Sequence, residues 1–526
     1  MRAGHASGQP WSSKSDSMID DILSRLDLDG IRDFPAELGA FSLESLYVRY
    51  SFTQDDYEAA LRSLPNADEL PDHLKTVVHE TTHLFQTTTT PFGMLIRRLR
   101  ILQGALVVDA IRKVRARGSA VSFPLKNMLR SLPRRLAAEV EEPIRMWYAV
   151  ELFILIMLGE TDVWEEHGRR NPLVQGVSLG ELFVLVQYSL AQHFAMEQWL
   201  QESLKRLRPE LFDLRLSRSA EPEHGGELPD WDAFKPDQID LAEEGRTEGA
   251  LLAADLLGGG LNTLAIIESA GTAAEFWGCR RLSLNQFKTE ISNASWASTM
   301  APKSWLIEAV RRLRATSLAE FILSYLVVCE VALFGPLLPQ HQQLRKGRIN
   351  LRELVPFLRW YALLNAASDV PPMTSLGDYE RYATAICRAL GWTPPKEVVD
   401  ASVASSPHMP DEPYERMYWK AQRVRSEAPG AFLNYPYIIA RLPMEFHFPV
   451  IAYKDKTVFL KDKVSLQLFN IGYLTRAVFR RMMLRADIGV TLPYSPLEVE
   501  KAFYTCELER ILEELLGFRV PGISVS

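Results

Sequence analysis

The segment 70–86 constrains this chain more than any other, because it combines a helical pattern with a His-Glu-x-x-His motif. Its first residues, Leu70-Pro71-Asp72, are typical of a helix start, and apolar residues then recur at helical spacing. Residues four apart on a helix lie about 40° apart around its axis, so His79 and His83 project from one face. Two imidazoles held in this way favour a zinc ion, with Glu80 beside them to take a proton from water. An ordinary helix with two surface histidines would show the same pattern.

The length and composition of the chain are those of a globular protein with several domains. Its 526 residues allow about two to four domains, and 47% hydrophobic with 24% charged residues is ordinary for a soluble protein. A net charge of -7 argues against general nucleic-acid binding. The most apolar runs, 148–158 and 321–338, are too short or carry Glu330, so they predict buried helices and no membrane span.

The cysteine content indicates a reducing compartment. Four cysteines lie far apart without a Cys-x-x-Cys pair, which is typical of buried free thiols: Cys279, Cys329, Cys387 and Cys506. Residues 1–17 are rich in Ser, Gly and Lys and lack an apolar core, so they predict a disordered tail and not a signal peptide. We therefore expect a cytoplasmic protein.

Helical patterns cover most of the chain and predict a mainly α (α+β) fold with a small β component. Period-two alternation within 41–52 predicts a strand, and 449–460 has the pattern of a hairpin. Five regions are expected along the chain: a disordered tail (1–17), a metal-binding core with a helical insertion and an acidic loop near 219–244 (18–290), a helical region (291–400), a linker (401–413), and a helical C-terminal region with a hairpin (414–526).

Two stretches of opposite charge follow the motif. Segment 97–135 carries eleven Arg and Lys residues against Asp109, and segment 219–244 carries nine acidic residues against Lys235. Ordinary solvated surface is one interpretation of both stretches. The other is a positive rim beside the metal helix, which would attract an acidic peptide or protein substrate and would be covered by the acidic segment.

Two histidines do not complete a catalytic zinc site, which takes three protein ligands and leaves a position for water. Glu268 is the main candidate for the third, because it is the only acidic residue between Asp255 and Glu275 in an apolar helical run. A carboxylate there is costly unless it is paired or bound to metal. Glu275 lies two turns further on, near the same face, where it could accept a hydrogen bond from a ligand histidine. Glu275 also competes for the third position, as do three other residues: His193, Glu197 and His224.

The combination of His79-Glu80-x-x-His83 with Glu268-x6-Glu275 resembles the gluzincin zinc metallopeptidases, which include thermolysin-like and aminopeptidase groups. The resemblance implies a zincin-like catalytic core in which His79, His83 and Glu268 bind Zn2+ and Glu80 is the general base. The chain departs from the family at Ile267, where Asn is usual. The gap from His83 to Glu268 is 268 − 83 = 185 residues, so a helical insertion is expected.

These features predict a zinc-dependent metallopeptidase that hydrolyses peptide bonds with metal-activated water and Glu80 as the general base. A first alternative is a non-enzymatic helical protein-interaction module with a vestigial motif. A second is a di-iron carboxylate helical bundle, because residues 80–83 are also Glu-x-x-His and residues 221–224 repeat that pattern. Cleavage specificity, the choice between endo- and exopeptidase, the oxyanion-stabilising residue and the oligomeric state are left open.

Overall fold

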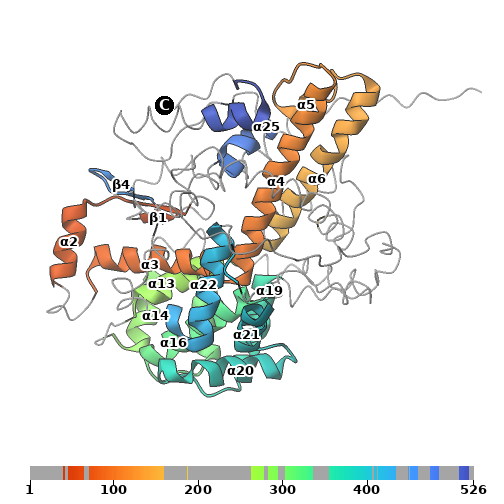
Figure 1. The fold of residues 1–526 in the computed structure, drawn as a ribbon. Helices are drawn as coiled ribbons and strands as arrows, with labels where there is room; N and C mark the ends of the chain where they lie inside the picture. The colour runs from red at the N-terminus through yellow and green to blue at the C-terminus, as the bar shows by residue number, and fades with distance from the viewer. Residues whose placement is uncertain are drawn as a thin grey trace, which may run out of the picture.

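Helices dominate the computed structural model, as predicted (Figure 1). The structure describes residues 39–41, 46–63, 70–158, 262–277, 282–293, 303–335, 355–405, 408–410, 413–433, 450–459, 474–484 and 509–520, with the single positions 186, 448 and 488. The α-helices in these ranges include α2 (Gln54–Ser63), α3 (Asp72–Thr88), α4 (Pro91–Ala116), α5 (Leu125–Met128), α6 (Arg134–Leu158), α13 (Thr263–Glu275), α14 (Leu284–Asn293), α15 (Lys303–Arg312), α16 (Leu318–Leu333), α19 (Pro356–Ala367), α20 (Tyr379–Ala389), α21 (Pro395–Ser405), α22 (Pro413–Glu427) and α25 (Phe479–Leu484). Residues 509–516 are helical as well. Short 3-10 and π turns are η7 (Leu376–Asp378), η8 (Ala431–Leu433) and η10 (Leu474–Val478).

The motif helix α3 ends in a tight joint with α4. Four threonine hydroxyls each donate to the carbonyl oxygen four residues earlier, at 2.5–2.8 Å, and so bond the last carbonyl groups of α3: Thr87, Thr88, Thr89 and Thr90. Thr90 also caps α4 by accepting from the Gly93 amide, and Pro91 occupies the first turn, where its missing N–H costs nothing. A Cβ atom at Gly93 would overlap the Thr87 carbonyl, so the crossing requires glycine.

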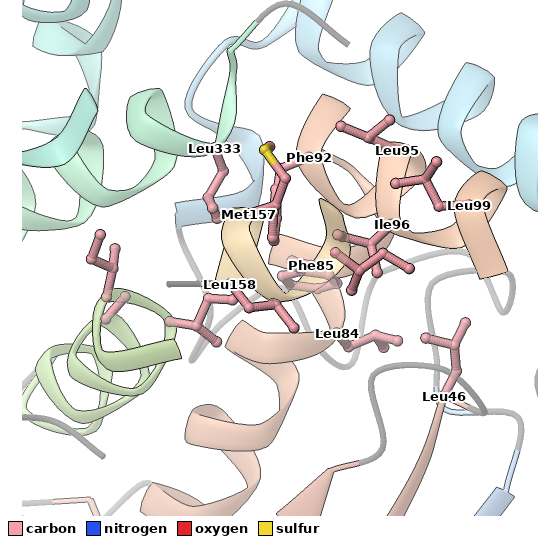
Figure 2. Close-up of a cluster of buried hydrophobic side chains, with 14 of the residues drawn as sticks. Leu46, Leu84, Phe85, Phe92, Leu95, Ile96, Leu99, Met157, Leu158 and Leu333 are labelled. Atoms are coloured by element: carbon pink, nitrogen blue, oxygen red, sulfur yellow. The ribbon is translucent and has the colours of Figure 1, made fainter. Parts of the chain in front are cut away.

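The hydrophobic core is centred on this joint. Figure 2 shows its side chains converging from α3, α4, α6, α16 and the residue before the second strand: Leu84, Phe85, Phe92, Leu95, Ile96, Leu99, Met157, Leu158, Leu333 and Leu46. The Thr263 hydroxyl donates to the Met157 carbonyl oxygen at 2.7 Å, which fixes the start of α13 to the end of α6. The core therefore holds both α3 and α13 in place.

The long helices α4 and α6 pack side by side as a hairpin that leads away from α3 (Figure 1). Arg100 and Glu151 form an ion pair between them at 2.5 Å, and the Gln103 amide also donates to Glu151, at 2.7 Å. All three side chains are buried, so each polar group depends on the others for compensation.

The small β component is a four-stranded sheet in the order β1 (Gly39–Phe41), β2 (Tyr47–Tyr50), β3 (Val450–Ala452) and β4 (Thr457–Phe459). The predicted hairpin is confirmed, since β3 pairs with β4 antiparallel. The strand predicted within 41–52 is confirmed in part, because β2 covers Tyr47–Tyr50 whereas Phe41 belongs to β1, which pairs antiparallel with β2. Strands β2 and β3 pair in parallel, with Tyr47 opposite Val450. One sheet therefore joins segments about 400 residues apart in the sequence.

The observed packing differs from the predicted division into regions. Residues 401–405, expected in a linker, belong to α21, and α22 packs against both α3 and α4. The Gln422 side-chain amide donates to the Thr89 carbonyl oxygen at 2.9 Å, and buried Arg425 pairs with Glu330. The shared sheet and these buried bonds join the expected C-terminal region to the metal-binding core. A change of composition marks a surface loop, and it does not separate the elements on either side.

The helices α4, α5 and α6 form the first part of the helical insertion that was expected between His83 and Glu268. Other predicted features lie outside the described residues: the tail 1–17, the acidic loop 219–244 and the part of the insertion around that loop. Cys329 and Cys387 are buried free thiols, as predicted, whereas Cys279 and Cys506 also lie outside. Among the helices that the structure describes, none has the length and apolar character needed to cross a membrane.

Candidate metal centre

The structure brings together the three residues that the sequence analysis proposed as metal ligands. His79 and His83 come from α3, and Glu268 comes from α13, which packs against α3. One donor atom from each residue lies within 4.8 Å of the other two. Within the described part of the chain, this is the group of His, Cys, Asp and Glu residues that could hold a metal ion.

The donor atoms have the separations expected around one ion. His79 Nε2 lies 3.2 Å from Glu268 Oε2, and His83 Nε2 lies 3.5 Å from Glu268 Oε1. Zinc bonds of about 2.1 Å place neighbouring ligands of a tetrahedral site about 3.4 Å apart. The two imidazole rings are 4.6 Å apart between centroids and nearly perpendicular, at 88°, so they approach the shared point from different directions. Two imidazole nitrogens and a carboxylate are also ligands that zinc accepts, so this donor set fits the ion.

Glu275 holds the first of these histidines. His79 Nδ1 lies 2.6 Å from Glu275 Oε1, while His79 Nε2 faces Glu268. Because a carboxylate only accepts, Nδ1 carries the proton that is donated to Glu275. This bond fixes the ring orientation and directs Nε2 towards Glu268, as the two-turn spacing of the glutamates predicted.

The electrostatics of the cluster favour a cation between the ligands. Burial alone would lower the pKa of His79, but its bonds to Glu268 and Glu275 outweigh burial and raise the pKa well above the usual value. Burial alone would raise the pKa of Glu268, but the nearby charge of His83 and the bond to His79 hold it well below its usual range. In the absence of metal, a proton on His79 Nε2 therefore compensates the negative charge of Glu268. A divalent ion bound between these residues would replace that proton.

Exposure differs across the centre. The side chain of His83 is 6% exposed and that of His79 is 16% exposed, whereas that of Glu268 is 31% exposed. The histidines are thus held within the protein, and the centre opens to solvent on the side of the α13 carboxylate.

Two close approaches of glycine shape the centre. A Cβ atom at Gly271 of α13 would lie 2.9 Å from His79 Nε2, which is too close for a side chain. A Cβ atom at Gly39 of β1 would lie 2.9 Å from Glu80 Oε1, so the strand backbone runs directly against Glu80. Phe41 lies two residues after Gly39, on the same face of the strand, and its ring stacks on the His83 ring with 6.3 Å between centroids. Strand β1 therefore covers part of the motif helix.

The sequence analysis missed a polar partner of the second histidine. Gln86 is buried, and its Oε1 lies 3.3 Å from His83 Nδ1. Gln86 follows His79 by seven residues, so the helical arithmetic that related Glu275 to Glu268 also places Gln86 on the face of α3 that carries the histidines. The contact of β1 with Glu80 and His83 had no comparable signal in the sequence.

Of the two interpretations of segment 97–135, the positive rim beside the metal helix is not found. Arg97 and Arg100 are buried, and Arg100 is paired with Glu151. The exposed cations of segment 97–135 begin at Arg112. Arg112 lies 15 residues after Arg97, which is about 22 Å along the axis of α4 at 1.5 Å per residue, at the end of the helix that leads to α5 (Figure 1). The sequence analysis treated all the Arg and Lys residues of segment 97–135 as exposed. A sequence does not show which arginines are buried against an acidic partner, as Arg100 is against Glu151.

Of the competing ligand candidates, Glu275 contacts His79 Nδ1 and not the nitrogen that faces Glu268. The other three candidates and the second Glu-x-x-His pattern lie outside the described residues: His193, Glu197, His224 and the segment 221–224. Comparison of the chain with protein-family models, with curated proteins and with solved structures gave no match. The resemblance to gluzincins therefore stays a prediction, and the function has to be argued from the geometry of the centre itself.

Proposed function

We propose that this protein is a cytoplasmic, zinc-dependent metallopeptidase that hydrolyses bonds in a peptide or protein substrate. The observation that supports this proposal most directly is the convergence of His79, His83 and Glu268 on one point, with Glu80 adjacent on the same helix. The buried free thiols of Cys329 and Cys387 support the reducing compartment.

Each residue has a distinct role in the proposed reaction. His79, His83 and Glu268 would hold the ion, and Zn2+ bound there would lower the pKa of water towards about 7 and polarise the substrate carbonyl. Glu80 accepts the proton of the attacking water and then passes it to the departing amine. Glu275 keeps the ring of His79 in the orientation that presents Nε2.

Metal analysis of the purified full-length protein is the first test. One bound zinc per chain is expected. Two bound irons would instead support the di-iron bundle, and no bound metal would support the non-enzymatic interaction module. Each of these two results would contradict the proposal.

A second test concerns hydrolysis. A mixture of synthetic peptides is incubated with the wild type and with Glu80→Gln, and the products are identified by mass spectrometry. The variant should keep its zinc but lose at least about 100-fold in turnover, because the carboxylate that moves the proton is gone. Glu290→Gln, an exposed change on α14, is the matched control and should behave as the wild type. Hydrolysis by Glu80→Gln at the wild-type rate would overturn the assignment of Glu80.

A further inference from the structure

We propose that Gln86 is a positioning residue of the metal centre, whose Oε1 accepts a hydrogen bond from Nδ1–H of His83 and so leaves His83 Nε2 free to bind the metal. The inference rests on the proposed metal centre and adds a residue to it. The observation that carries it is the contact of 3.3 Å between Gln86 Oε1 and His83 Nδ1, made inside the protein by two buried side chains.

The arrangement has a direct chemical consequence. A neutral imidazole carries its proton on one nitrogen, and the other nitrogen has the lone pair that binds a metal. His83 Nε2 is the nitrogen that faces Glu268, at 3.5 Å. The metal-binding form therefore needs the proton on Nδ1, and Nδ1 needs an acceptor. Gln86 supplies that acceptor for His83, as Glu275 does for His79.

The orientation of the Gln86 amide follows from the other side of its side chain. Gln86 also lines a small cavity whose polar groups are Thr82, Thr90, Glu330 and Arg425. The Arg425 guanidinium already donates to Glu330 and to the Thr89 hydroxyl. The hydroxyls of Thr82 and Thr90 already donate to backbone carbonyls, so towards the cavity their oxygens, like the carboxylate of Glu330, are acceptors. The amide NH2 group is thus favoured on the cavity side, which leaves the carbonyl oxygen facing His83.

Three variants of the full-length protein separate this role from simple packing. Gln86→Met keeps the length and volume of the side chain but removes the acceptor, whereas Gln86→Glu keeps an acceptor oxygen. Gln422→Met is the matched control, because it removes another buried glutamine, whose amide donates to the Thr89 carbonyl just after α3 and which forms no hydrogen bond with His83 in the described structure. Thermal unfolding of all three variants measures the cost in packing.

The decisive measurement is the tautomer of His83 in metal-free protein that also carries Glu268→Ala, because the Glu268 carboxylate would otherwise attract a proton to Nε2. It is read from the ¹⁵N shifts of selectively labelled histidine at alkaline pH, and His83→Gln identifies its signals. In this background, the protein with Gln86 intact, Gln86→Glu and Gln422→Met should show the proton on Nδ1, whereas Gln86→Met should shift the population towards the Nε2-protonated form that free histidine prefers. With Glu268 present, the zinc affinity of Gln86→Met in chelator competition should fall about 10–100-fold.

The outcomes are distinguishable from those of the proposed function. If Gln86→Met keeps the wild-type tautomer, Gln86 has only a packing role and the inference is wrong, even if the variant is less stable. The same conclusion follows if Gln86→Met and Gln422→Met lose zinc affinity equally. A wild type that binds no zinc would instead contradict the proposed function, while the tautomer measurement would still decide whether Gln86 orients His83.

Discussion

Gly271 of α13 faces His79 of α3 so closely that a Cβ atom added to Gly271 would lie 2.9 Å from His79 Nε2. Gly271→Ala should therefore push the imidazole away from Glu268 and Glu275, and zinc affinity should fall at least about tenfold, because ligand orientation sets metal affinity. Chelator competition measures the change. Gly377→Ala is a suitable control, since its Cβ would meet only Ser375 Oγ at an ordinary 3.5 Å. Unchanged zinc affinity in Gly271→Ala would show that His79 does not bind the metal in the orientation seen here.

Glu268 and Glu275 contact the same histidine but should have unequal importance. Glu268 faces both His79 and His83, so Glu268→Ala removes a ligand and should strip most of the zinc. Glu275 contacts only Nδ1 of His79 in the described structure, so Glu275→Ala should weaken zinc binding about 10–100-fold. Glu275→Gln keeps an acceptor and should lose less. Metal content after dialysis ranks the three proteins, and a tightly bound zinc in Glu268→Ala would show that the third ligand had been misidentified.

The part of the centre that could be predicted from the sequence is the part that local periodicity encodes. His79 and His83 share a face because they lie one helical turn apart, and Glu268 was identified by the cost of an unpaired carboxylate in an apolar run. The geometry now places these three together. Gln86 was available to the same reasoning, because it follows His79 by the spacing that separates Glu275 from Glu268.

The rest of the centre depends on contacts between distant segments, which no local pattern records. Strand β1 has three residues, and its position over Glu80 follows from pairing with β2, which in turn pairs with β3 near residue 450. Likewise, Arg100 is buried because Glu151 compensates it from another helix. Mainly helical content is a sum of local preferences and was predicted correctly, whereas the sheet order and the buried ion pairs required the tertiary structure.

Gly39→Ala should separate catalysis from metal binding. A Cβ atom at Gly39 would lie 2.6 Å from Thr76 Cγ2 and 2.9 Å from Glu80 Oε1, so the Glu80 carboxylate or the strand has to move. Displacement of a general base lowers turnover steeply, and we expect a loss of about 10–100-fold with the zinc content unchanged. Peptide hydrolysis and metal analysis on the same preparation test this. Gly430→Ala serves as the control, because its Cβ would meet Tyr379 at an ordinary 3.5 Å. Full activity in Gly39→Ala would place the working position of Glu80 away from β1.

The buried pair of Arg100 and Glu151 predicts how stability depends on pH. Burial alone would raise the pKa of Glu151, but the charges of Arg100 and Arg480 outweigh burial and lower it to about 2. A folded-state pKa below the unfolded value of about 4.5 stabilises the fold above pH 4.5, and this contribution is lost as the pH falls from about 4.5 towards 2.

Glu151→Gln should therefore lower the free energy of unfolding at pH 7 by roughly 3 kcal/mol, because a buried guanidinium loses its charged partner. The difference from the wild type should shrink as the pH falls below about 4.5, since the unfolded wild-type chain then binds a proton at Glu151 that the folded protein does not bind until about pH 2. Denaturant titrations at pH 7 and at pH 3 measure both values. Glu142→Gln, an exposed change on the same helix, should alter the free energy of unfolding little at either pH. A difference between Glu151→Gln and the wild type that is equally large at pH 3 and pH 7 would mean that packing, and not the charge of Glu151, is what α4 and α6 require at this position.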